Sequence, residues 1–210
     1  TTSLPHQLEG KQHNNPNDLA VDKQGRFWFT DPFNASAGDQ ELDPMSVLRL
    51  DPKGHDQWEL TRATHDVSRP NGVLISRDQK TLYVAQSDYS PDQPRQLRAY
   101  PINDDGSLGD YVTLHTFGID HRGVQRGVDG MTLDAEGNIV VCAGWEQSGP
   151  GPIIYVFAPT GRILETHALR VDRPTNCCFG DPDMKTLYVT TGGGHLFRAR
   201  TDRTGWIMWP

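Results

Sequence analysis

The chain has 210 residues, of which 35% are hydrophobic and 22% charged, and its formal net charge is -7 at pH 7. This length is enough for one large domain with a sizeable core. The acidic balance excludes a general nucleic-acid partner, because phosphate binding needs a basic face, and no apolar run reaches the about 18 residues of a membrane span. We therefore expect neither a nucleic acid nor a membrane as partner.

Four segments have the pattern of a β-hairpin. Each begins with a short polar cluster, continues as an apolar strand, turns on Gly or Asp, and returns as a second apolar strand. In chain order they are PNDLAVDKQGRFWFTD (16–31), RPNGVLISRDQKTLYVAQSD (69–88), VDGMTLDAEGNIVVCAG (128–144) and PTNCCFGDPDMKTLYVTT (174–191).

The hairpins repeat, and the segments between them supply further strands. The additional strand patterns cover residues 46–51, 96–102, 152–166 and 195–201. A repeat of roughly 40 to 50 residues with several short strands is typical of a β-propeller blade, and convincing helical periodicity is absent. The sequence therefore predicts an all-β chain, with one β-propeller domain over residues 1–210.

The polar cluster of each hairpin contains one residue that we single out: Asn17, Asn71, Asp129 and Asn176. In a propeller the innermost strand of every blade lines the central channel, so corresponding residues at the starts of these strands converge at one end. The four side chains would then surround a small-molecule site. Turn chemistry is the alternative, because Asn and Gly after Pro are ordinary loop formers.

The three cysteines, Cys142, Cys177 and Cys178, form no disulfide framework and match no zinc spacing. We expect them to be small buried strand residues. No Gly-x-Ser-x-Gly nucleophile motif occurs, and no cysteine has a clear catalytic partner. A hydrolytic activity should therefore use a metal and water.

The four hairpin segments, in this order and at these distances, resemble the SMP-30/gluconolactonase/luciferin-regenerating-enzyme family. The resemblance covers nearly the whole chain. It implies a six-bladed β-propeller, of which about four to five blades fit this chain, and metal-dependent hydrolysis of lactones, sugar lactones above all. We expect the domain over residues 1–210 to be incomplete at its N-terminus and to lack the first blade of the family.

The resemblance also implies roles for the singled-out residues. The family holds its metal with a Glu from the first blade, the Asn of the Pro-Asn-Gly block and the Asp of the Asp-Gly-Met block. The last two match Asn71 and Asp129, and the matching Asp is also the favoured general base. Asn17 matches an Asn that contacts substrate or a bound water, and we expect Asn176 to line the pocket beside it. Oxygen ligands favour Ca²⁺, with Zn²⁺, Mg²⁺ or Mn²⁺ as alternatives.

Two departures from the family pattern concern the site. The acidic ligand belongs to a Glu-Gly-Pro motif, whereas Glu9-Gly10 is followed by Lys11, directly before the first hairpin, and is not that ligand. Some members carry a substrate-contacting Arg at the position of Asn15. Losing the acidic ligand should weaken metal binding considerably.

The leading functional hypothesis is a metal-dependent hydrolase that opens sugar-type lactones, in which the metal polarises the carbonyl and Asp129 activates water. One alternative keeps the site but acts on other esters or on phosphotriesters. Another is a non-catalytic or inactive propeller fragment that binds a ligand or a metal. No signal peptide is visible in residues 1–11, and we expect a cytoplasmic rather than a periplasmic or secreted protein.

Overall fold

The computed structural model describes residues 4–35 and 38–207, and these ranges contain β-strands and no α-helix. The first large sheet consists of β3 (Leu19–Val21), β4 (Phe27–Asp31), β5 (Ser46–Gly54) and β6 (Gln57–Arg62). The second consists of β7 (Pro70–Ile75), β8 (Thr81–Ser87), β9 (Arg95–Pro101) and β10 (Val112–Phe117). The third consists of β13 (Val128–Leu133), β14 (Ile139–Trp145), β15 (Ser148–Phe157) and β16 (Ile163–Ala168).

A fourth sheet has three strands, β17 (Pro174–Gly180), β18 (Thr186–Thr191) and β19 (Leu196–Arg200). Two short hairpins complete the described strands: β1 (Gln7–Leu8) with β2 (Lys11–Gln12), and β11 (Ile119–Asp120) with β12 (Gly123–Val124). None of the described residues belongs to a helix long and apolar enough to cross a membrane.

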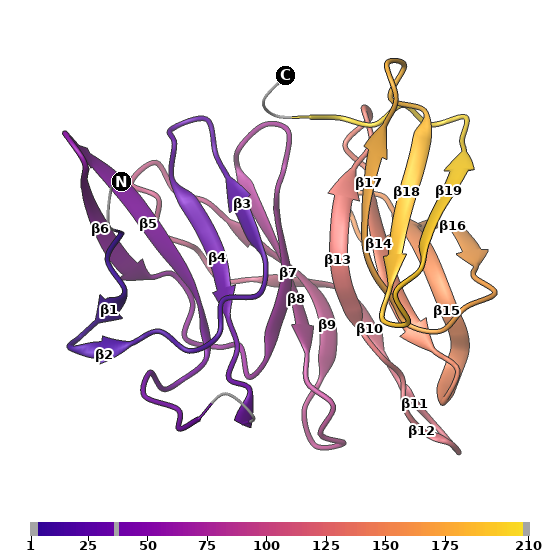
Figure 1. Ribbon diagram of the computed structural model, residues 1–210, viewed down its shortest axis with the longest axis horizontal. Coiled ribbons are helices and arrows are strands. Elements are labelled where there is room, and N and C mark those ends of the chain that lie inside the picture. The colour runs from indigo at the N-terminus through magenta and orange to yellow at the C-terminus, as the bar shows by residue number, and fades with distance from the viewer. Residues whose placement is uncertain (1–3, 36–37, 208–210) are drawn as a thin grey trace.

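Every large sheet is an antiparallel meander in which consecutive strands pair. The first strands of the sheets, β3, β7, β13 and β17, each lie against the next one in the chain. Figure 1 shows the sheets following one another from the indigo end on the left to the yellow end on the right. This arrangement confirms the predicted all-β propeller architecture and the predicted hairpins, while the number of blades in the complete ring stays a prediction.

The hydrophobic core is divided among the spaces between neighbouring sheets. Trp28, Val47, Val73 and Ile75 belong to a cluster between the first and second sheets. A second cluster, with Leu97, Phe117, Ile139 and Phe157, lies between the second and third sheets. A third, with Val140, Cys142, Cys177 and Phe179, lies between the third and fourth. The alternation of apolar residues along each strand places these side chains on both faces of the middle sheets.

The cysteines follow the prediction with one exception. Cys142 and Cys177 are buried in the core between the third and fourth sheets. Cys178 is exposed, so the prediction of a buried residue is wrong for it. The reason is the two-residue period of β17, which turns successive side chains to opposite faces of the sheet.

The inner strands of the second, third and fourth sheets begin with a β-bulge. In the second sheet Pro70 pairs with Gln86 and Val73 pairs with Val84, so that two residues, Asn71 and Gly72, face only one on β8. The same irregularity occurs in the third sheet, where it contains Asp129 and Gly130. A bulge bends the strand and redirects a side chain. This explains why strands can open on residues that strands usually avoid.

The bulge of the fourth sheet has a different register. Pro174 pairs with Thr191 and Asn176 pairs with Thr190, which leaves Thr175 as the extra residue. Thr175 therefore occupies the position that Asn71 and Asp129 hold in their strands. Asn176 lies one residue farther along, at the position of the glycines.

The glycine in each of two bulges permits neighbouring inner strands to approach closely. A Cβ atom added to Gly72 would overlap the backbone carbonyl oxygen of Asp129. A Cβ atom added to Gly130 would overlap the side-chain amide of Asn176. Asn71 and Asp129 are thereby held side by side by backbone packing.

We predict that Gly72→Ala lowers the free energy of unfolding by about 1–3 kcal/mol, because β7 or β13 must move to accommodate the methyl group. Urea denaturation measures the change. Gly109→Ala is the matched control, since its new Cβ would meet only Pro101 at ordinary contact distance. Equal stability of the two variants would contradict the close approach of the strands.

Candidate functional site

Asp129 is the centre of the polar side chains at the bulged ends of the inner strands. Its carboxylate forms an ion pair with Arg126, through Oδ2 and Nη2, and the two side chains are only 20% and 6% exposed. Burial raises the pKa of Asp129 above its ordinary value of 3.8, and the charge of Asp18 acts in the same direction. Arg126 and a hydrogen bond from Asn71 partly offset this rise. A carboxylate with a raised pKa is a stronger base than one in water.

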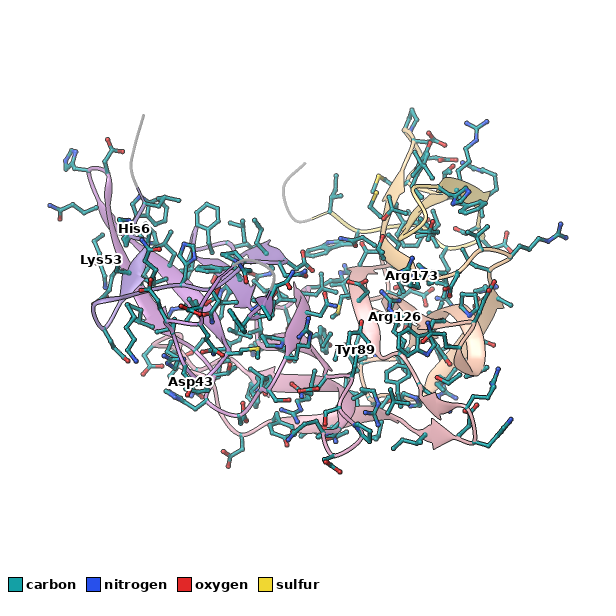
Figure 2. All side chains as sticks on the ribbon, turned by 60° about the horizontal axis from the view of Figure 1, so that its bottom comes forward. His6, Asp43, Lys53, Tyr89, Arg126 and Arg173 are labelled. Atoms are coloured by element: carbon teal, nitrogen blue, oxygen red, sulfur yellow. The ribbon has the colours of Figure 1, made fainter. Side chains whose placement is uncertain are left out.

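Arg126 holds Asp129 in place through several contacts. Its Nη1 atom donates to the carbonyl oxygens of Pro174, at 2.8 Å, and of Gly144, at 3.3 Å. Its own carbonyl accepts a hydrogen bond of 3.0 Å from the N–H of Gly144. The guanidinium therefore ties the third sheet to the start of β17 and lies buried against the carboxylate. Figure 2 labels Arg126 to the right of the centre of the molecule, with Tyr89 close to it in the view.

Asp18 joins the site from the first sheet. Its Oδ2 atom accepts a hydrogen bond of 3.1 Å from the backbone N–H of Val73, and its Oδ1 atom accepts one of 2.9 Å from Leu19. Burial raises the pKa of Asp18, and these two hydrogen bonds partly offset the rise. Asp18 thus binds backbone groups at the start of β3 and in β7. The charge of Asp18 also raises the pKa of Asp129, so the two carboxylates belong to the same site.

Asn71 contributes an unsatisfied oxygen. Its Oδ1 atom is buried and has no hydrogen-bond partner among the described residues. A buried carbonyl oxygen without a partner carries a desolvation cost unless a hydrogen-bond donor or a cation compensates it. The Oδ1 atom of Asn71 is therefore an oxygen ligand of the type that a hard cation binds.

The other predicted residues are placed less centrally. Asn17 is exposed, immediately before Asp18, and its backbone N–H bonds the carbonyl of Thr30 at 3.0 Å. Asn176 is also exposed, and its side chain lies against Gly130 while its Oδ1 atom accepts a hydrogen bond from the N–H of Cys177. The substrate-binding roles of Asn17 and Asn176 stay predictions.

Glu9 lies in the turn of the β1–β2 hairpin, where it and Gly10 both have positive φ angles. Its carboxylate faces Arg62 at 3.9 Å and is 65% exposed. This placement agrees with the prediction that Glu9 is not the missing metal ligand.

The residues present fit a hard cation in part. The carboxylates of Asp129 and Asp18 and the amide oxygen of Asn71 are oxygen donors, the type that Ca²⁺ and Mg²⁺ prefer. Across residues 4–35 and 38–207, however, no three His, Cys, Asp or Glu side chains form a group that could hold a metal. A cation here would depend on the neutral amide of Asn71.

Two large hollows lie apart from these residues. One, of about 850 Å³, is lined by residues such as Arg77, Tyr83 and Trp206. The other, of about 830 Å³, lies between the third and fourth sheets and is lined by Ile154 and Phe197 among others. Neither is lined by Asn71 or Asp129.

The fold and the polar side chains at the inner strand ends define a β-propeller with a candidate site where its inner strands meet. The family model described as SMP-30/Gluconolactonase/LRE-like region matches residues 1–193. The chain belongs to this family, which confirms the resemblance of the four hairpin segments.

Several relatives are similar over most of the chain. It is 33% identical over 205 residues to a gluconolactonase from Zymomonas mobilis, which covers 94% of this chain and 53% of that protein. It is 30% identical over 196 residues to regucalcin from Xenopus laevis, which covers 90% of this chain and 58% of that protein. The chain thus spans little more than half the length of these relatives.

Solved structures agree with the fold. A gluconolactonase from Xanthomonas campestris superposes with a TM-score of 0.71 at 31% identity and covers 94% of this chain and 60% of that chain. A luciferin-regenerating enzyme superposes with a TM-score of 0.68 at 20% identity, covering 93% and 64%, and shows the shared fold.

We predict that Arg126→Met lowers the free energy of unfolding at neutral pH by about 3–5 kcal/mol, because it leaves a buried carboxylate without its partner. The folded chain binds the Asp129 proton more tightly than the unfolded chain does, because the pKa of Asp129 is raised above 3.8 on folding. The free energy of unfolding therefore falls as the pH rises from 3.8 through the raised pKa. Without Arg126 this fall should be larger and extend to higher pH. Urea denaturation at several pH values measures it.

The control is the same substitution in an Asp129→Asn background, where no carboxylate is left to ionise. There, Arg126→Met should add no pH-dependent loss at all. Identical pH profiles for Arg126→Met and the unchanged chain would contradict the role of Arg126 as counter-ion.

Proposed function

We propose that this chain carries the catalytic part of a metal-dependent hydrolase that opens sugar-type lactones. The observation that supports the proposal best is the buried Asp129 carboxylate, paired with Arg126 and adjacent to the unsatisfied Oδ1 atom of Asn71. Relatives named gluconolactonase, 6-deoxy-6-sulfogluconolactonase and pentonolactonase favour lactones as the substrate class.

Asp129 would act as the general base. The charge of Arg126 favours the ionised carboxylate, while burial holds its pKa above that of an exposed Asp. The carboxylate takes a proton from a water molecule as that water attacks the lactone carbonyl carbon. The bond from this carbon to the ring oxygen then breaks, the ring oxygen gains a proton, and a hydroxy acid is released.

Asn71 and Asp129 would hold the divalent cation, with Ca²⁺ as the first candidate and Zn²⁺, Mg²⁺ or Mn²⁺ as alternatives. When bound, the cation would polarise the lactone carbonyl and stabilise the charge that develops on its oxygen. Asn17, at the same end of the inner strands, is the proposed substrate contact of the first sheet, and Asn176 that of the fourth. Both are exposed, as a group that meets a substrate must be.

A non-catalytic binding propeller is the second candidate. The observation that favours it is the small number of charged ligands: within the described ranges no third acidic side chain joins Asp18 and Asp129. The alternative substrates, other esters or phosphotriesters, would use the same residues and differ in the groups that contact the leaving group.

We predict that Asp129→Asn lowers kcat for gluconolactone hydrolysis by about 10²–10⁴-fold, the usual contribution of a general base. The assay follows acid release by the longest form of the protein that carries this chain. Asp104→Asn, an exposed turn residue, is the matched control and should leave kcat unchanged. Chelation should abolish activity, and the divalent ion should restore it.

Full activity of Asp129→Asn would overturn the role of Asp129. Activity that chelation does not change would overturn the metal dependence alone. Binding of the lactone without turnover, in every form tested, would favour the non-catalytic propeller.

A further inference from the structure

A second group of buried polar atoms belongs to residues at the end of β4 and in the segment before β3. His13 Nδ1, Asn14 Oδ1 and Asp31 Oδ1 are all buried without a hydrogen-bond partner among the described residues. Asp31, at the end of β4, is 0% exposed. An unpartnered carboxylate oxygen at such a position is costly unless something compensates its charge.

The orientation of Asn14 is determined by its other hydrogen bonds. Its backbone N–H donates to Asp31 Oδ2 at 2.8 Å, and its Nδ2 atom donates to the carbonyl oxygens of Leu42, at 2.9 Å, and Asp31, at 3.3 Å. Exchanging the amide nitrogen and oxygen of Asn14 would remove both hydrogen bonds that Nδ2 donates. The Oδ1 atom is therefore the one left without a partner.

His13 is fixed beside this pair. Its ring packs edge-on against Phe29, with ring centroids 6.4 Å apart, and its backbone N–H donates to the carbonyl of His6 at 3.2 Å. Burial raises the pKa of Asp31, and the N–H of Asn14 and the charges of His13 and Arg62 act against this rise. His6, which directly precedes β1, and Asp43, which precedes β5, are labelled in the left half of Figure 2.

A small hollow opens beside these residues. It has a volume of about 320 Å³, and its lining includes His13, Asn14, Asp39 and Glu41. The two acidic side chains give the hollow a negative lining. The nearest cation, Arg62, already donates to the carbonyl of Pro44 at 2.6 Å.

We propose that His13, Asn14 and Asp31 form a second divalent-cation site, which takes Mn²⁺ or Zn²⁺. One cation would satisfy a carboxylate oxygen, an amide oxygen and an imidazole nitrogen together, whereas a hydrogen bond between any two of them would leave the third without a partner. Imidazole combined with oxygen donors suits Zn²⁺ and Mn²⁺ better than Ca²⁺. Water molecules in the hollow would complete the coordination.

This site uses other residues than the proposed lactonase site. Its residues precede or end β4, whereas Asn71 and Asp129 lie on the inner strands β7 and β13. Its ligand set contains a histidine, and none of the residues described at the other site is a histidine. A spectroscopic signal from a coordinated imidazole nitrogen therefore distinguishes the two sites.

The experiment is pulsed electron paramagnetic resonance on the untagged, metal-free chain loaded with Mn²⁺, which detects the coupling of Mn²⁺ to an imidazole nitrogen. We expect this coupling in the unchanged chain and in Asp129→Asn. We expect His13→Phe, which keeps the aromatic contact with Phe29, to lose the coupling and to bind this Mn²⁺ ion about tenfold or more weakly. His6→Phe is the matched control, since His6 is exposed, and should keep the signal.

If His13→Phe fails to fold, His13→Gln takes its place. Absence of the coupling in the unchanged chain would overturn the proposal and indicate that water satisfies the three atoms. Persistence of the coupling in both His13 variants would overturn it as well, because another histidine would then be the ligand. Loss of the coupling in Asp129→Asn would show that the ion belongs to the other site.

Discussion

The close approach of consecutive inner strands is the constraint on which the rest of this structure depends. Gly72 lies against the backbone of Asp129, and Gly130 lies against the side chain of Asn176. The contact of Gly72 requires a glycine, because a Cβ atom there would push β7 and β13 apart, whereas at Gly130 the side chain of Asn176 would have to move. These contacts bring polar residues from different sheets within reach of one another, although these residues lie far apart in the sequence.

The same approach explains the electrostatics of the site. Asp18, Asn71 and Asp129 come from three sheets, yet the pKa of Asp129 depends on both of the others. Two carboxylates this close repel each other, and burial strengthens the repulsion. The buried guanidinium of Arg126 offsets part of it, so Asp129 combines a pKa above its ordinary value with a neighbouring positive charge that favours the carboxylate form.

Much of the fold follows from short-range sequence patterns. Alternating apolar residues and the turn residues between them were sufficient to predict the hairpins, and the repeat predicted that their polar clusters meet at one end. The register of Asn176 was not predictable, because the β17 bulge takes Thr175 as its extra residue and sequence spacing does not reveal which residue is extra. Arg126 was missed because its partners, apart from Asp129, are backbone carbonyls, which every residue type possesses.

The division of the core among the sheets has a consequence for cooperativity. The second and third sheets each share a hydrophobic cluster with both neighbouring sheets. Stability in such an arrangement is approximately a sum over nearest-neighbour interfaces. Asn71 and Asp129 lie on the two sheets that enclose the cluster with Leu97 and Phe157, so the two residues separate only when that interface opens.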